Sequence, residues 1–192
     1  KKVDKATNGK VGYIYIPDMG PEGLNEFSRY FYPQLDKEGL IIDDRANGGG
    51  NVSPMILERL SREPYRLTMR RGSSLIGTVP DAVQVGPKVC LINKYSASDG
   101  DLFPWGFRAL GLGKLIGTRT WGGIIGISGP LPYMDGTDIR VPFFTSYDPK
   151  TGNWIIENHG VDPDILIDND PIKEWNGEDQ QLDRAIEEVM KQ

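Results

Sequence analysis

Residues 88–117 have the sequence KVCLINKYSASDGDLFPWGFRALGLGKLIG, in which a polar turn and a helical pattern separate two apolar runs. The first run, 88–93, is typical of a buried strand, and 101–110 is typical of a helix with a proline near its start. Residues 114–117 predict a second, short strand. Because strand, helix and strand follow one another, we predict two parallel strands joined by a crossover helix.

The same alternation occurs upstream. Residues 11–17 and 39–44 are apolar runs typical of strands, and each precedes a helical pattern, at 22–32 and at 53–61. Repeated strand-helix units favour an α/β fold with a mostly parallel sheet flanked by helices. Open sheets of this kind carry their sites at the carboxyl ends of the strands, so we expect function in the loops that follow them.

The C-terminal part of the chain has a different pattern. Residues 131–141 contain an Asp-Gly turn between extended segments, which predicts a β-hairpin. A further extended segment is expected at 154–157, and apolar positions at helical spacing predict a closing helix over 179–190. Residues 1–10 are polar, and we interpret them as a tail or linker before a single domain of residues 11–192.

Composition limits the classes of partner. The chain has 192 residues, 38% of them hydrophobic, which suffices for one domain with a sizeable core. The net charge is −5 and the basic residues are scattered apart from Arg70 and Arg71, so we expect no nucleic-acid or membrane partner. One cysteine, Cys90, excludes an internal disulfide. No apolar stretch approaches the roughly 20 residues that span a bilayer, and the polar start resembles neither a signal peptide nor an initiator methionine, so we expect a piece of a longer protein.

A serine lies at the predicted strand-to-helix turn. Ser98 stands between the apolar run 88–93 and the helical pattern. Backbone N–H groups in the first turn of a helix have no internal partner and can bind the oxyanion of a tetrahedral intermediate beside such a nucleophile. Asp99 would donate one of them. The alternative is that Ser96, Ser98 and Asp99 only cap the helix, because serine and aspartate are favoured there.

A glycine-rich loop follows the strand predicted at 39–44. Residues 45–51, RANGGGN, contain three adjacent glycines, which permit backbone conformations and close approaches that side chains prevent. The loop lacks the Gly-Lys-Ser/Thr ending of a phosphate-binding loop and has no G-x-G-x-x-G spacing. A loop that presents amides to an oxyanion or to a peptide backbone fits better, and a plain turn without function is the alternative.

A serine hydroxyl needs a base to remove its proton. The chain has one histidine, His159, so a triad of Ser98, His159 and an aspartate is one possibility, and an exposed or hydrogen-bonded histidine in a turn is the other. Arg119 follows Gly-Thr where a lysine base would fit, but a guanidinium stays protonated. Lys94 and Lys114 are weaker candidates. The residues alone therefore give a nucleophile without a convincing base.

Five sequence blocks occur in one order from about Val11 onward. They are GYIYIPDMGPEGLN (12–25), RANGGG (45–50), SDGDLF (98–103), LGLGKLIGTRTWGG (110–123) and ENHGVDPD (157–164). In these blocks the chain resembles the C-terminal catalytic lobe of the serine peptidase family that contains the tricorn and the C-terminal processing proteases. The resemblance implies a Clp-protease/crotonase-like α/β fold, a peptide substrate, and no metal or organic cofactor.

The resemblance also assigns roles to individual residues. It makes Ser98 the nucleophile and the backbone amides of Gly50 and Asp99 the oxyanion hole. Glu157 would orient a histidine base through an intervening serine, and that Ser-His pair would belong to a separate upstream lobe, before a PDZ-like domain. His159 falls where relatives such as tricorn carry a tyrosine, which argues against it as the base.

Two further differences from the family pattern bear on the branch of the family that the chain resembles and on its substrate specificity. Arg119 replaces the lysine base of the processing proteases and points to the histidine-using tricorn branch. Residues 67–69, LTM, lack the acidic residue that gives tricorn its preference for basic side chains, so we do not expect that preference. The isolated lobe should be inactive or nearly so, because its general base is missing. We expect a cytoplasmic location, with export left open, and a homo-oligomer would fit the resemblance.

Two other functions stay open. A relative could use this fold to hold a peptide or an apolar ligand without cleaving it, although a binding module would need neither Ser98 nor Glu157. A crotonase-like acyl-CoA enzyme shares the general architecture and also uses oxyanion-hole amides, but only fold analogy supports it.

Overall fold

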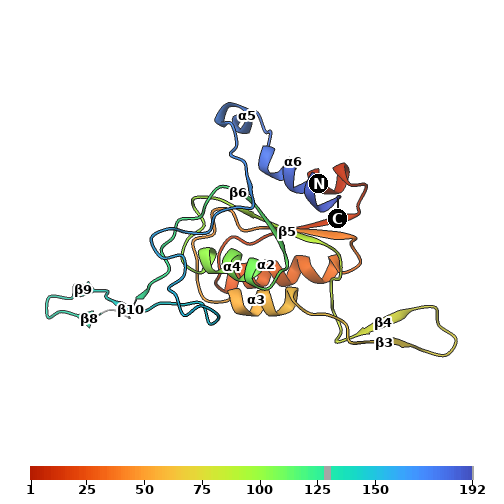
Figure 1. The fold of residues 1–192 in the computed structure, drawn as a ribbon, viewed down its shortest axis with the longest axis horizontal. Helices are drawn as coiled ribbons and strands as arrows, with labels where there is room; N and C mark the ends of the chain where they lie inside the picture. Colours follow the sequence, from red (N-terminus) through yellow and green to blue (C-terminus); the bar gives the residue numbers. More distant parts are fainter. Residues whose placement is uncertain (128–130, 192) are drawn as a thin grey trace.

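Five parallel strands form the central sheet. The computed structural model describes residues 1–127 and 131–191. The strands lie in the order β1 (Val11–Tyr15), β2 (Gly39–Asp43), β5 (Lys88–Ile92), β6 (Gly113–Gly117) and β11 (Ile165–Leu166). β2 and β5 are buried at every position, as expected of strands covered on both faces. The predicted mostly parallel sheet flanked by helices is confirmed (Figure 1).

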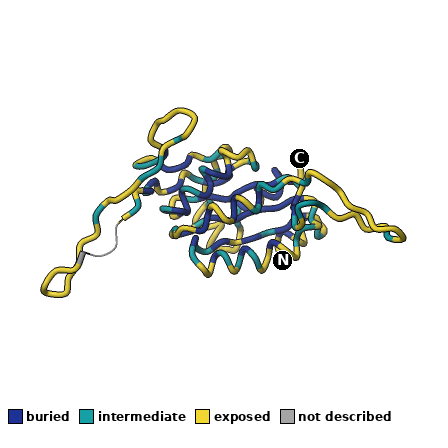
Figure 2. The backbone as a smooth tube through the Cα atoms, turned by 90° about the horizontal axis from the view of Figure 1, so that it is seen from below, coloured by how far each residue is buried: buried dark blue, intermediate teal, exposed yellow. Residues whose placement is uncertain are grey.

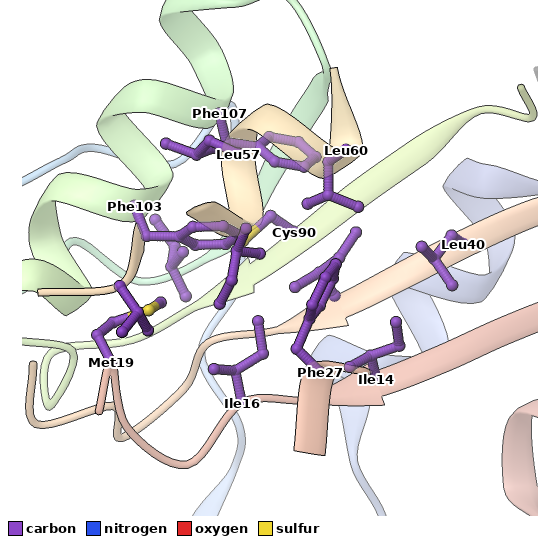
Figure 3. Close-up of a cluster of buried hydrophobic side chains, with 14 of the residues drawn as sticks. Ile14, Ile16, Met19, Phe27, Leu40, Leu57, Leu60, Cys90, Phe103 and Phe107 are labelled. Atoms are coloured by element: carbon purple, nitrogen blue, oxygen red, sulfur yellow. The ribbon is translucent and has the colours of Figure 1, made fainter. Parts of the chain in front are cut away.

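Three helices cover one face of the sheet. α2 (Pro21–Phe31), α3 (Ser53–Leu60) and α4 (Asp99–Ala109) each follow a strand, and the strands they connect advance across the sheet in one direction. Successive crossovers of one hand therefore place all three on the same side. Their apolar side chains pack with Leu40 and Ile42 of β2 in the larger core cluster (Figure 3).

The two ends of the chain cover the opposite face. α6 (Gln180–Val189) and α1 (Lys2–Ala6) enclose a second cluster that includes Val3. The first ten residues are therefore not simply the polar tail or linker that we expected. Val3 is 5% exposed, and the Thr7 hydroxyl donates to its carbonyl at 2.9 Å to close the short helix. A single apolar side chain gives no periodic pattern, which is why the sequence did not show this helix.

Two arms extend from opposite ends of the molecule, and both are largely exposed (Figure 2). β3 (Arg66–Met69) and β4 (Ile76–Val79) form an antiparallel hairpin between α3 and β5, which was not predicted. The other arm contains β8 (Leu131–Pro132) and β9 (Asp138–Ile139), which confirm the expected hairpin.

Four short elements complete the fold. They are η1 (Tyr32–Gln34), β7 (Gly126–Ile127), β10 (Pro142–Phe144) and α5 (Pro171–Trp175). β7 and β10 pair in antiparallel fashion at the base of the second arm. Across residues 1–127 and 131–191, no helix has the length and apolar character to cross a bilayer.

Candidate active site

Ser98 lies at the turn between β5 and α4. Its backbone has φ 57° and ψ −119°, a conformation that costs a residue with a side chain energy and that is concentrated at functional sites. The side chain is partly exposed and makes no capping hydrogen bond to α4. Because the helix begins at Asp99, Ser98 directly precedes the amides of the first turn.

The side chains of Ser96 and Asp99 form hydrogen bonds with residues outside α4. Ser96 is fully buried, and its hydroxyl donates to the Asp44 carbonyl at 2.8 Å. The Asp99 carboxylate accepts from the amide of Ser53 at 2.9 Å and from its hydroxyl at 2.5 Å, which holds the start of α3 against the start of α4. The interpretation of Ser96, Ser98 and Asp99 as mere caps of α4 is therefore wrong.

The glycine-rich loop passes directly beside the serine. Gly49 and Gly50 have φ angles of 97° and 151°. A Cβ on Gly49 would lie 2.7 Å from the Cβ of Ser98, and a Cβ on Gly50 would lie 2.0 Å from the Met19 carbonyl oxygen. Both positions therefore require glycine, for their backbone conformation and for their close approaches.

Asn47 fastens this loop to its surroundings. Its buried side chain donates to the Ile16 carbonyl at 3.1 Å and accepts from the Gly49 amide at 2.9 Å. The Ala97 amide donates to the Asn47 carbonyl at 2.8 Å. The loop and the turn that carries Ser98 are thus parts of one hydrogen-bonded structure.

The backbone amides of Gly50 and Asp99, near the serine, have no hydrogen-bond acceptor within residues 1–127 and 131–191. The Met19 amide donates to the Gly49 carbonyl at 2.9 Å, and the Asn51 amide donates to the Met19 carbonyl at 2.7 Å. The amide of Gly50, which stands between Gly49 and Asn51 in the chain, has no acceptor among the described residues. The amide of Asp99 has none either, and its nitrogen lies 3.1 Å from the position of a Cβ on Gly49. Such N–H groups can stabilise a negatively charged oxygen.

Glu157 is held by the loop that follows β6. Its Oε2 accepts from the amide of Ile124 at 2.6 Å and from the amide of Ile125 at 3.1 Å. The side chain is half-buried, and its Oε1 accepts no hydrogen bond from any described residue. A carboxylate that is fixed through one oxygen can accept a further donor at the other.

The same loop reaches the helix that begins after Ser98. The Trp121 amide donates to the Ser96 carbonyl at 2.9 Å. The amides of Gly122 and Gly123 donate to the carboxylate of Asp101 at 2.8 and 3.3 Å. A single loop therefore connects the serine turn with the carboxylate of Glu157.

His159 does not contact the serine. Its Nε2 lies 2.6 Å from Oδ2 of Asp162, and its ring lines a cavity of about 700 Å³ together with Trp105 and Leu110. That cavity is at the C-terminal end of α4, whereas Ser98 precedes the N-terminal end. The structure therefore does not assemble the internal triad that the lone histidine suggested.

The two lysines also lie apart from the hydroxyl. Lys114 is the second residue of β6, and its ammonium is 2.5 Å from a carboxylate oxygen of Glu188. Lys94 lies over the ring of Tyr95, with its nitrogen 5.3 Å from the ring centre. No group of three or more His, Cys, Asp or Glu side chains in the described part of the chain could hold a metal ion.

Two buried aspartates at the site were missed by the sequence analysis. Asp44 follows β2, is fully buried, and its carboxylate finds no hydrogen-bond partner among the described residues. Burial, reinforced by neighbouring aspartates, raises its pKa well above the usual range. Asp101 is also fully buried, and burial raises its pKa while hydrogen bonds to its carboxylate oppose the rise. An acidic residue beside an apolar run is the only signal that the sequence gives for either.

The chain is similar to known proteins along most of its length. The model of "Peptidase family S41" matches residues 10–167. The tricorn protease of Thermoplasma volcanium is 44% identical over 99% of this chain and 18% of its own length, and tricorn protease homolog 1 of Streptomyces coelicolor is 38% identical over 96% of this chain and 17% of its own.

Solved structures give the same result. The crystal structure of the tricorn protease superposes with a TM-score of 0.91 and 42% identity, over 99% of this chain and 18% of that one. The photosystem II D1 C-terminal processing protease shares the fold, with a TM-score of 0.60 and 22% identity over 82% of this chain and 42% of that one. The chain thus spans less than a fifth of the length of the Thermoplasma volcanium protein and of the tricorn protease in the crystal structure. Its fold is the expected Clp-protease-like α/β type, and the chain belongs to peptidase family S41.

Proposed function

We propose that this chain is the nucleophile-bearing lobe of a serine endopeptidase. The observation that carries the proposal is the position of Ser98, whose hydroxyl caps no helix and lies beside two amides without acceptors. Membership in peptidase family S41 supports the same reaction class. In this proposal Ser98 is the nucleophile, and the amides of Gly50 and Asp99 form the oxyanion hole.

The reaction follows from these positions. The hydroxyl oxygen of Ser98 attacks the carbonyl carbon of a peptide bond while a base takes its proton. The carbonyl oxygen becomes negatively charged and is stabilised by the two amides, in a loop and a helix start that need no rearrangement. The C–N bond then breaks as the protonated base gives its proton to the leaving amine. Water next attacks the acyl-enzyme while the base takes its proton, and the carboxylic acid leaves as the base returns that proton to the Ser98 oxygen.

The base is supplied by another part of the same polypeptide. Neither His159 nor the two lysines contacts Ser98, and the tricorn proteins matched by this chain are far longer than it is. We propose an upstream lobe that brings a histidine to the serine, followed by a PDZ-like domain. The free Oε1 of Glu157 would accept a hydrogen bond from a serine on that lobe, and this serine would orient the histidine.

A non-catalytic module that holds a peptide or an apolar ligand is the second candidate. The cavity of about 700 Å³ at the end of α4 favours it, because Trp105, Leu110 and Ile156 give part of its lining an apolar character. This function uses neither the strained turn at Ser98 nor the amides beside it. The two candidates therefore differ in whether the serine reacts.

Covalent labelling of the full-length protein with a fluorophosphonate tests the proposal. We expect the label on Ser98, located by mass spectrometry of the digested protein. The Ser98→Ala variant should take up no label, Glu157→Gln should label more slowly, and residues 1–192 alone should label weakly because the base is absent.

A folded full-length protein that takes up no label would refute the peptidase and favour the binding module. Rapid labelling of residues 1–192 alone would instead show that the base lies within this chain. Hydrolysis of a peptide substrate, compared between wild type and Ser98→Ala, is the matched measurement of turnover.

A further inference from the structure

Four consecutive backbone amides donate to two carboxylates. The amides of Gly122 and Gly123 donate to Asp101, and those of Ile124 and Ile125 donate to Glu157. Because these residues follow one another in a single loop, the two carboxylates are joined through one short piece of backbone. A shift of the loop at Asp101 therefore shifts the amides that hold Glu157.

Asp101 is also tied to the nucleophile. It lies in the first turn of α4, and its amide donates to the carbonyl of Ser98 at 2.8 Å. The residue is fully buried, so its carboxylate is not available to a substrate. Its two acceptor bonds to the loop are thus structural contacts between the helix that begins after Ser98 and the segment that presents Glu157.

We propose that Asp101 is a positioning residue of the peptidase reaction, which fixes the loop 122–125 and thereby sets the place of Glu157 relative to Ser98. The inference rests on the proposed function, because it assumes that Ser98 and Glu157 act in one reaction. It adds a residue that touches neither the substrate nor the reacting atoms.

The chemistry of the carboxylate explains why an aspartate is needed. Both of its oxygens are acceptors, so it can receive two amide N–H groups with charge-assisted hydrogen bonds. An asparagine of the same shape offers one acceptor and turns an NH₂ group toward the second amide. That amide would be repelled, and the loop would shift at Gly122 and Gly123.

A double-mutant cycle in the full-length protein tests the inference. Peptide hydrolysis is measured for wild type, Asp101→Asn, Glu157→Gln and the double variant. A small misplacement of a catalytic group lowers the rate strongly, so we expect Asp101→Asn to reduce kcat by about 10- to 100-fold with KM almost unchanged. If Asp101 acts through Glu157, the double variant should be no slower than the slower single variant.

A control for the loss of a carboxylate charge exists at the start of α5. Asp170 also accepts from two consecutive amides, those of Ile172 at 2.8 Å and Lys173 at 3.2 Å, but it is exposed and forms no hydrogen bond with Ser98 or with the loop 122–125. Both amides donate to Oδ1, which an asparagine retains, so the Asp170→Asn variant removes the carboxylate charge without removing either acceptor bond. It should retain the kcat of the wild type.

Several results would overturn the inference. They are an unchanged kcat in Asp101→Asn, a change in KM alone, and losses that multiply in the double variant. If Asp101→Asn does not fold, Asp101→Ser takes its place, since its hydroxyl oxygen can still accept from one amide. Failure of both variants to fold would make Asp101 a structural residue. Activity that survives in Ser98→Ala would refute the proposed function itself, which keeps the two failures distinct.

Discussion

Gly49 lies against Ser98 so closely that a Cβ on the glycine would be 2.7 Å from the Cβ of the serine. The same added carbon would be 2.8 Å from the carbonyl oxygen of Ala97. Either the loop or the serine turn would have to move, and the φ of 97° at Gly49 disfavours any other residue. The contact between the two segments therefore admits only glycine.

Replacement of this glycine should separate the loop from the nucleophile. We expect Gly49→Ala to slow fluorophosphonate labelling of the full-length protein by about 100-fold, since the Gly50 amide would move with the loop. Gly48→Ala is the control, because a Cβ there meets nothing within 4 Å. Equal losses in the two variants, at equal melting temperatures, would show that the close contact with Ser98 is not the cause.

Arg45 should be a major source of stability. Its guanidinium lies 2.6 Å from Asp43 and 2.9 Å from Asp179, with only 14% of its side chain exposed, and it joins the end of β2 to the start of α6. Arg45→Ala leaves two carboxylates without their partner, so we expect the free energy of unfolding to fall by about 3–5 kcal/mol in urea titrations. The exposed pair of Arg62 and Glu58 is the comparison, and Arg62→Ala should cost far less.

Asp44 should make the stability fall as the pH rises. Burial raises its pKa above 3.8 in the folded protein, whereas the unfolded chain ionises near that value. The folded state is therefore at its full stability below pH 3.8 and loses stability as the pH rises through the folded pKa. Asp44→Asn cannot ionise. Thermal unfolding should show the variant gaining on the wild type over the pH range that begins at 3.8 and extends up through the folded pKa. A constant difference across this range would contradict the assignment.

Cys90 should be inert in the native protein. It is fully buried in β5, and burial raises the pKa of its thiol well above the usual range, so little reactive thiolate forms. Iodoacetamide should therefore modify it only in denaturant. Because the chain has no other cysteine, the total incorporation reports on this residue alone. Rapid modification under native conditions would show that β5 opens far more readily than its burial implies.

Strong periodic patterns predicted most of the fold. The apolar runs at β2 and β5 are buried at every position, and the closing helix follows the spacing of Leu182 and Ile186. The hairpin of β3 and β4 gave no such signal, because the residues of β3 are all exposed and do not alternate. Where tertiary contacts rather than local pattern create an element, the sequence alone could not show it.

Some residues of the candidate site could be predicted from the sequence and others could not. Ser98 and the glycines could be singled out because a nucleophile and a close approach each demand a particular residue type at a turn. Asp101 could not, since its importance depends on Gly122 and Gly123, which only the folded chain brings to it. Glu157 became a candidate through the family resemblance, and an isolated carboxylate in a turn would have carried no signal.

The strand order also indicates which loops can vary in sequence without displacing the nucleophile and which cannot. The serine turn and the glycine loop both follow strands, whereas the β3–β4 hairpin lies after α3 and before β5, at the amino-terminal edge of the sheet (Figure 1). Insertions, deletions or altered side chains in that hairpin can therefore accumulate without displacing the nucleophile. We therefore expect homologues to differ more in this hairpin than in the serine turn and the glycine loop.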